Sequence, residues 1–111
     1  MAYNNVTPIK IGQIGMNTTY FVLYTTPANS RTYVKDINIM NTTSATIGVY
    51  VSFVPDGQLP NGDNALFYNV QLPPYTAVQW AGSQVLIPGD TVQVKASAVG
   101  CTINVSGGEA V

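Results

Sequence analysis

The chain has 111 residues, of which only four are Lys or Arg and five are Asp or Glu, so its formal net charge is −1. It contains no histidine and one cysteine, which excludes Ser-His-Asp and Cys-His catalysis, a histidine metal site and an intrachain disulfide. Four dispersed cations do not form the basic surface that nucleic acid requires, and no apolar run is long enough to predict a membrane span.

The first part of the chain predicts two strands, because apolar residues recur at period two between turn residues. The strand expected at 8–14 places Ile9 and Ile11 on one face. The strand expected at 18–26 is apolar on both faces, alternating Tyr20, Val22 and Tyr24 with Phe21 and Leu23. We therefore expect this second strand to be central in a sheet or covered on both sides.

Two amphipathic strands follow at 33–40 and 46–54, separated by a short polar connection. In the first, Ile37 and Ile39 point inward while Asp36 and Asn38 point outward. The second is the clearest amphipathic strand of the chain. Its inward face carries Ile47, Val49, Val51 and Phe53, and its outward face carries Gly48, Tyr50 and Ser52.

The second half of the chain is punctuated by glycine and proline. Two prolines, an Asp-Gly pair and an Asn-Gly pair predict a long loop at 55–64, and Pro-Gly-Asp at 88–90 fits a type II turn. Between and after these turns we expect strands at 65–72, 75–81, 85–87, 91–97 and 101–106. The tail at 107–111 is expected to be loose, and residues 1–7 form either an arm that reaches a neighbour or a frayed terminus.

About eight short strands with turns every 8–12 residues or so predict a single all-β domain over residues 1–111, a compact antiparallel β-sandwich or jelly-roll-like fold. Cys101 shares a face with two apolar neighbours, so we interpret it as a small buried residue and not as a reactive thiol. The expected core consists of Phe21, Leu23, Ile37, Ile39, Ile47, Val49, Val51, Phe53, Trp80, Val92, Val94, Cys101, Ile103 and Val105.

Five carboxylates remain for chemistry, and they do not predict an enzyme. Asp56 and Asp63 are the pair that the long loop can bring together, yet each stands beside glycine in a turn context. With Asn61 and Asn64 the same loop offers enough oxygens for calcium, but its spacing matches no calcium-loop motif. Plain turn chemistry is the favoured interpretation, and no catalytic residue, metal or cofactor is predicted.

The tyrosines are the candidate binding residues. Tyr20, Tyr24 and Tyr50 are predicted to form an outer stripe that a neighbouring subunit buries, since tyrosine supplies contact area together with a hydrogen bond. The alternatives are that they cover sheet edges or stack on a glycan. The segments 20–24 and 47–54 carry no charge or proline, which favours a homo-oligomer that hides them.

Four stretches occur in an order that resembles small structural proteins of tailed bacteriophages, the β-sandwich subunits that decorate heads or attach to necks, tails and fibres. They are LYTTPANSR at 23–31, VKDINIMNT at 34–42, LIPGDTV at 86–92 and VSGGE at 105–109. The resemblance covers roughly residues 18–109, and such a family brings no catalytic residues.

The resemblance implies a non-enzymatic virion protein that is made in the host cytoplasm and decorates or cements a capsid as a homo-oligomer, possibly a trimer. The implied partners are other virion proteins, such as the major capsid or tail proteins, and neither nucleic acid nor membrane. A place in the neck, tail, baseplate or fibre base is the first alternative. A carbohydrate- or receptor-binding module that uses exposed tyrosines and the loop at 55–64 is the second.

Overall fold

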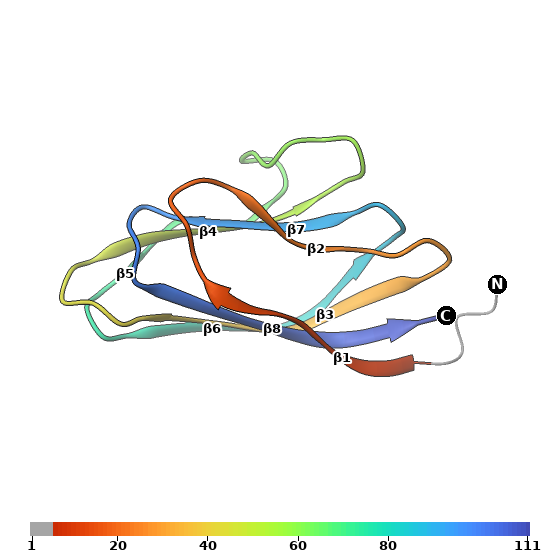
Figure 1. Cartoon of the computed structure of the whole chain (residues 1–111), viewed down its shortest axis with the longest axis horizontal. Coiled ribbons are helices and arrows are strands. Elements are labelled where there is room, and N and C mark those ends of the chain that lie inside the picture. The colour runs from red at the N-terminus through yellow and green to blue at the C-terminus, as the bar shows by residue number, and fades with distance from the viewer. Residues whose placement is uncertain (1–5) are drawn as a thin grey trace.

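The computed structural model describes residues 6–111 and contains eight strands in two antiparallel sheets (Figure 1). The predicted all-β class is confirmed, and no helix in the described range is long and apolar enough to cross a membrane. The strands are β1 (Val6–Gly15), β2 (Phe21–Thr25), β3 (Arg31–Asn41), β4 (Ile47–Val54), β5 (Ala65–Leu72), β6 (Ala77–Leu86), β7 (Thr91–Ala96) and β8 (Cys101–Ala110).

The topology is that of one long hairpin wrapped on itself. Each strand of the first half pairs antiparallel with its counterpart in the second half: β1 with β8, β2 with β7, β3 with β6 and β4 with β5. Wrapping adds the pairs β3–β8 and β4–β7, which gives the sheet orders β1-β8-β3-β6 and β2-β7-β4-β5. This arrangement is a jelly roll, so the predicted β-sandwich is confirmed at the level of its topology.

The core lies between the two sheets, where alternate residues of each strand meet. Of the residues expected there, Phe21, Leu23, Phe53 and Trp80 are half-buried and pack against the core, and the others are buried. Further buried apolar side chains were not expected, because they stand at strand ends or beside bulges, where strict alternation breaks down. They are Ile11, Met16, Val34, Val54, Leu72, Leu86, Ala96 and Ala110.

The prediction for the second strand is wrong in its placement. β2 is a short edge strand of its sheet, and its register with β7 shifts between Val22 and Tyr24. Because residues directly opposite each other lie on one face, Tyr24 opposite the buried Val92 points inward, whereas Val22 opposite Gln93 points outward. The extra residue therefore moves Tyr24 to the face opposite the one that simple alternation predicts.

Two strands expected at 75–81 and 85–87 form the single strand β6. Val34 of β3 pairs with Gln84 and Asp36 pairs with Ala81, so one residue of β3 faces Gly82 and Ser83 of β6. This is a β-bulge, which interrupts the ladder without ending the strand. The glycine and serine that suggested a break therefore mark a bulge inside one strand.

The expectation of a loose tail is wrong up to Ala110. β8 continues through Gly107 and Gly108 and pairs on one side with β1 and on the other with β3. Of the expected N-terminal arm, residues 1–5 lie outside the described residues, and Val6 and Thr7 belong to β1. The two glycines stand inside a central strand because the neighbouring strands come unusually close. A Cβ on Gly107 would overlap the carbonyl oxygen of Tyr33.

We predict that Gly107→Ala lowers the free energy of unfolding by about 1–3 kcal/mol, because the added methyl group forces β8 away from the backbone of β3. Gly15→Ala is the matched control, since nothing lies within 4 Å of the Cβ position there. Urea denaturation followed by circular dichroism measures both. Equal stability of the two variants would contradict the close approach of β8 and β3.

Candidate protein interface

The outer face of the sheet β2-β7-β4-β5 carries an aromatic cluster around one lysine. Tyr50 of β4 lies directly opposite Lys95 of β7, Tyr20 comes just before β2, and Tyr68 stands on β5. Four segments far apart in the sequence thus bring their side chains to one place. We refer to Tyr20, Tyr50, Tyr68 and Lys95 as the tyrosine surface.

The side chains of the tyrosine surface hold one another in place. The ring of Tyr50 lies 6.1 Å from that of Tyr20 and 5.3 Å from that of Tyr68, with interplanar angles of 73° and 81°. Lys95 Nζ lies 4.8 Å from the centre of the Tyr20 ring and 4.5 Å from that of Tyr50. Edge-to-face pairs and cation–π contacts each contribute about 0.5–1.5 kcal/mol. These contacts fix the orientations of the four side chains before any partner binds. Less side-chain entropy is therefore lost on association.

Some side chains on this outer face are exposed to solvent, and others are buried. Tyr68 is 62% exposed and Val22, on the outer face of β2, is 51% exposed. Ser52 points to the same side of β4 as Tyr50 and yet is fully buried, so neighbouring side chains cover the strand here. Burial also raises the pKa of the Tyr20 hydroxyl. This outer face thus combines packed side chains, such as Ser52, with the exposed aromatic ring of Tyr68.

The structure brings Tyr20 and Tyr50 of the predicted stripe together and places Tyr24 elsewhere. The Tyr24 hydroxyl reaches from β2 to the opposite sheet, where it lies 2.9 Å from Thr32 Oγ1 and donates to Glu109 Oε2 at 3.3 Å. Its place in the cluster is taken by Tyr68, which the predicted stripe omitted. Along β5, Tyr68 follows the half-buried Phe67 and therefore points to the opposite face of the sheet. This alternation is the sequence signal that predicts an outward position for Tyr68.

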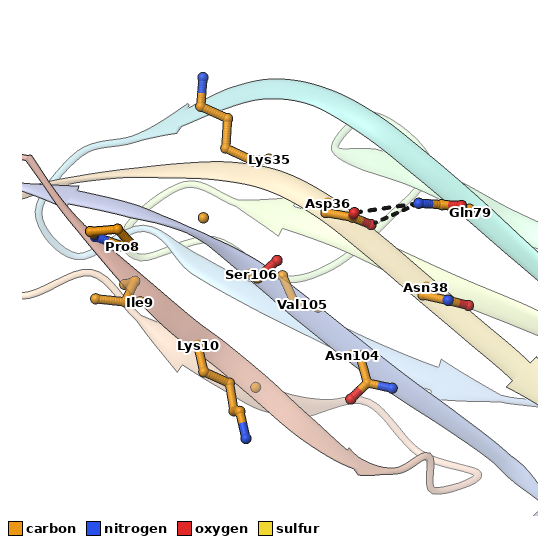
Figure 2. A pocket seen from close by; sticks show the side chains of 12 residues that line it. Pro8, Ile9, Lys10, Lys35, Asp36, Asn38, Gln79, Asn104, Val105 and Ser106 are labelled. Atoms are coloured by element: carbon orange, nitrogen blue, oxygen red, sulfur yellow. Dashed lines mark hydrogen bonds between the residues drawn. The ribbon is translucent and has the colours of Figure 1, made fainter.

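The outer face of the other sheet is different in character. A shallow groove crosses it, lined largely by polar residues of β1, β3, β6 and β8 (Figure 2). Gln79 Nε2 donates to the Asp36 carboxylate at 3.3 Å, and Asn38 and Asn104 lie beside this pair. None of the residues that line the groove is aromatic, so it offers no platform on which a sugar ring would stack.

The long loop at 55–64 uses its polar groups on itself and on a neighbouring turn. The oxygens of Asn61 and Asn64 accept backbone hydrogen bonds from within the loop at 2.8 and 3.0 Å. Asp56 packs on Gly89, which has the positive φ of 88° expected for the Pro-Gly-Asp turn. Within residues 6–111, no three His, Cys, Asp or Glu side chains gather as a metal site would require.

The two ends of the sandwich differ in charge. At one end, backbone hydrogen bonds join the turn after β2 to the turn at 87–90, and the backbone N–H of Asp56 in the loop at 55–64 donates to Asp90 Oδ1. This end contains Asp56, Asp63 and Asp90. At the other end the connections 16–20, 42–46, 73–76 and 97–100 carry no charged residue. Tyr75, with a positive φ of 55°, is 64% exposed there. The uncharged end therefore has no charged side chain that would lose its hydration on contact with a protein.

These features define the class of protein as a jelly-roll domain with an aromatic outer surface. No protein-family model matches the chain, and no curated protein matches it. Solved structures do match it. They include a structure of the infectious bursal disease virus Gx strain (TM-score 0.56, 12% identity) and one of the VP2 subviral particle of that virus (TM-score 0.54, 11% identity).

Each match covers 96% of this chain, and the chain spans about a third, 32%, of each matched chain. A T13 viral particle of the same virus matches at a TM-score of 0.50 with 14% identity. At this identity the matches establish a shared fold. They come from infectious bursal disease virus and not from a tailed phage, the source that the sequence resemblance led us to expect.

The buried thiol of Cys101 and the half-buried hydroxyl groups of Tyr20 and Tyr24 predict how stability depends on pH. Burial raises the pKa of Cys101 above its ordinary 9.0 and those of Tyr20 and Tyr24 above 10.0. The unfolded chain therefore loses these protons at lower pH than the folded chain, so the free energy of unfolding falls as pH rises above about 9. Urea denaturation at pH 7–11 measures this. In Cys101→Ala the fall should begin closer to pH 10, and a curve that stays flat to pH 11 would contradict the prediction.

Tyr50→Lys tests the tyrosine surface as an interface. The substitution removes two ring contacts and places a second ammonium group beside Lys95, on an outward face that the core does not need. We predict a folded chain whose self-association through this surface is at least about tenfold weaker by sedimentation velocity. Leu59→Lys, at a 78% exposed position in the loop at 55–64, is the control and should not change the association. An unchanged mass for Tyr50→Lys would refute the assignment.

Proposed function

We propose that this chain is a non-enzymatic structural protein of a virus particle, which decorates or cements the capsid of a tailed bacteriophage. The observation that carries the proposal is the tyrosine surface, an ordered aromatic cluster on the outside of a jelly roll. A chain with nine charged residues and net charge −1 has little self-repulsion to keep copies apart. Such a surface is suited to burial against another protein subunit.

The fold and the sequence motifs support the same proposal from separate directions. Jelly rolls are a common architecture of viral capsid domains, and the chain matches structures of infectious bursal disease virus particles along almost all of its length. The ordered motifs at 23–42 and 86–109 resemble those of phage accessory proteins. The fold therefore supports a virion role, and the motifs support the choice of a phage.

In the proposed mechanism, burial of the tyrosine surface between subunits strengthens the shell. Tyr50 lies at the centre of the cluster, with exposed Tyr68 beside it, which is the arrangement of an interface whose central aromatic residues contribute most of the affinity. A protein that binds only the assembled shell shifts the equilibrium towards assembly by mass action. We expect a homo-oligomer, with a trimer as one arrangement, and partners such as the major capsid or tail proteins.

The geometry favours a protein partner over a sugar. Stacking on a sugar requires an open ring face, but Lys95 Nζ lies against the rings of both Tyr20 and Tyr50, and the rings of Tyr20 and Tyr68 pack edge-on against Tyr50. Lys95 therefore contacts the rings of Tyr20 and Tyr50, and a partner meets the exposed ring of Tyr68 beside them. A tyrosine side chain forms hydrogen bonds and apolar contacts with another protein surface.

Antibody-gold labelling of intact particles, viewed by electron microscopy, tests the proposed function. We predict label spread over the whole head. Label confined to the neck, tail or baseplate would establish the alternative location. Absence of label from every particle, while the protein is present in the lysate, would overturn the proposal.

Add-back to particles assembled without the protein tests the same proposal through its interface. The wild-type chain and Leu59→Lys are expected to bind such particles, and Tyr50→Lys to bind at least about tenfold more weakly. Co-sedimentation with the particles measures the bound fraction. Equal binding of all three chains would show that the tyrosine surface does not attach the protein to the shell.

A further inference from the structure

Each sheet has two edges, and the four edge strands differ in how far they are protected from pairing. β1 contains Pro8 and Lys10 and a bulge at Ile11, all of which hinder the addition of another strand. β2 has five residues and its own bulge. β5 is interrupted near its middle, where Asn69 has a positive φ of 54°.

β6 lacks these protective features along half of its length. It carries neither charge nor proline, and residues 77–81 keep an unbroken register with β3 before the bulge at Gly82 and Ser83. Their outward side chains, Ala77, Gln79 and Ala81, are exposed. On the side away from β3, this segment presents backbone N–H and C=O groups that no other strand of the sheet can satisfy.

We propose that residues 77–81 of β6 pair antiparallel with the same residues of a second copy, across a two-fold axis at Gln79. The sheet β1-β8-β3-β6 would then continue into that of the second copy as one eight-stranded sheet. This inference is independent of the proposed function, because it depends only on the edge strand and on no viral partner.

The segment Ala-Val-Gln-Trp-Ala is complementary to itself in this register. Ala77 lies opposite Ala81 of the second copy, Val78 opposite Trp80, and Gln79 opposite Gln79. Val78 and Trp80 lie on the inner face and are only half-buried, so pairing would bury more of both. Aromatic and β-branched residues directly opposite each other are a favourable cross-strand pair. The central glutamines each supply an amide donor and an acceptor.

No charged residue lies within residues 77–81. The nearby charges on the outer face belong to β3: Asp36 accepts a hydrogen bond from Gln79, and Lys35 donates one to Ser83, outside the segment that pairs. Three strand spacings and a four-residue offset along the strands would separate the two Asp36 side chains by roughly 20 Å, which exceeds the Debye length in physiological salt. A slip of one residue would turn Trp80 to the solvent, so the inward face also sets the register. The side chains of this segment therefore favour a single register with a second copy.

A cysteine at the two-fold axis tests the register directly. In Gln79→Cys the two thiols would belong to residues with Cα atoms about 4.5–5.5 Å apart, which is within disulfide range. The native Cys101 is buried and does not compete. We predict a covalent dimer on a non-reducing gel after mild oxidation. In Asn38→Cys, which lies opposite residue 79 on β3, the two cysteines would be roughly 14 Å apart. This variant should form no covalent dimer on the same gel.

A charge at the axis tests the energetics. Gln79→Lys would set two like charges directly opposite each other, and we predict at least a tenfold weaker dimer by sedimentation equilibrium, whereas Asn38→Lys should have little effect. Absence of a cross-link in Gln79→Cys, or equal cross-linking of Asn38→Cys, would overturn the inference. Tyr50→Lys should not alter the cross-link. The assignment of the tyrosine surface as an interface and the pairing of β6 can therefore be refuted separately.

Discussion

Burial of alternate apolar side chains between two sheets is the constraint on which the rest of this structure depends. The wrapped hairpin sets β3 and β8 side by side in one layer and β4 and β7 in the other, so that the inward residues of these central strands form one core. Each strand then has an outward face that the core does not specify. On those free faces the two sheets become chemically different, and the candidate interface lies on one of them.

Bulges are the means by which one strand changes the face that it presents. The register shift in β2 turns Tyr24 inward, towards Thr32 and Glu109, and leaves Tyr20 and Val22 outside. The shift in β6 separates a regular half from the half that packs near the long loop. In the other sheet the central pair β4–β7 keeps an unbroken register, whereas the central pair β3–β8 shifts between Val34 and Asp36, and the buried side chains of both sheets still form one continuous core.

The small number of charged side chains affects which parts of the surface can be buried against protein. Lys95 is held by the rings of Tyr20 and Tyr50, and three of the carboxylates gather at one end of the sandwich. The uncharged end and the segment 77–81 of β6 carry no charge and would bury against protein at little electrostatic cost, whereas the tyrosine surface carries one charge, on Lys95. A subunit with several such regions makes contacts in several directions, as a component of a larger assembly requires.

The sequence by itself determined the strands of the central layers, the inward residues such as Ile37, Val51 and Val94, and the Pro-Gly-Asp turn. These features follow from local periodicity and from the backbone preferences of glycine and proline. Only the tertiary structure decided that β2 is an edge, that β8 runs on to Ala110, and that Tyr68 rather than Tyr24 joins Tyr50. These outcomes depend on the register between strands far apart in the chain, which the alternation within one strand does not encode.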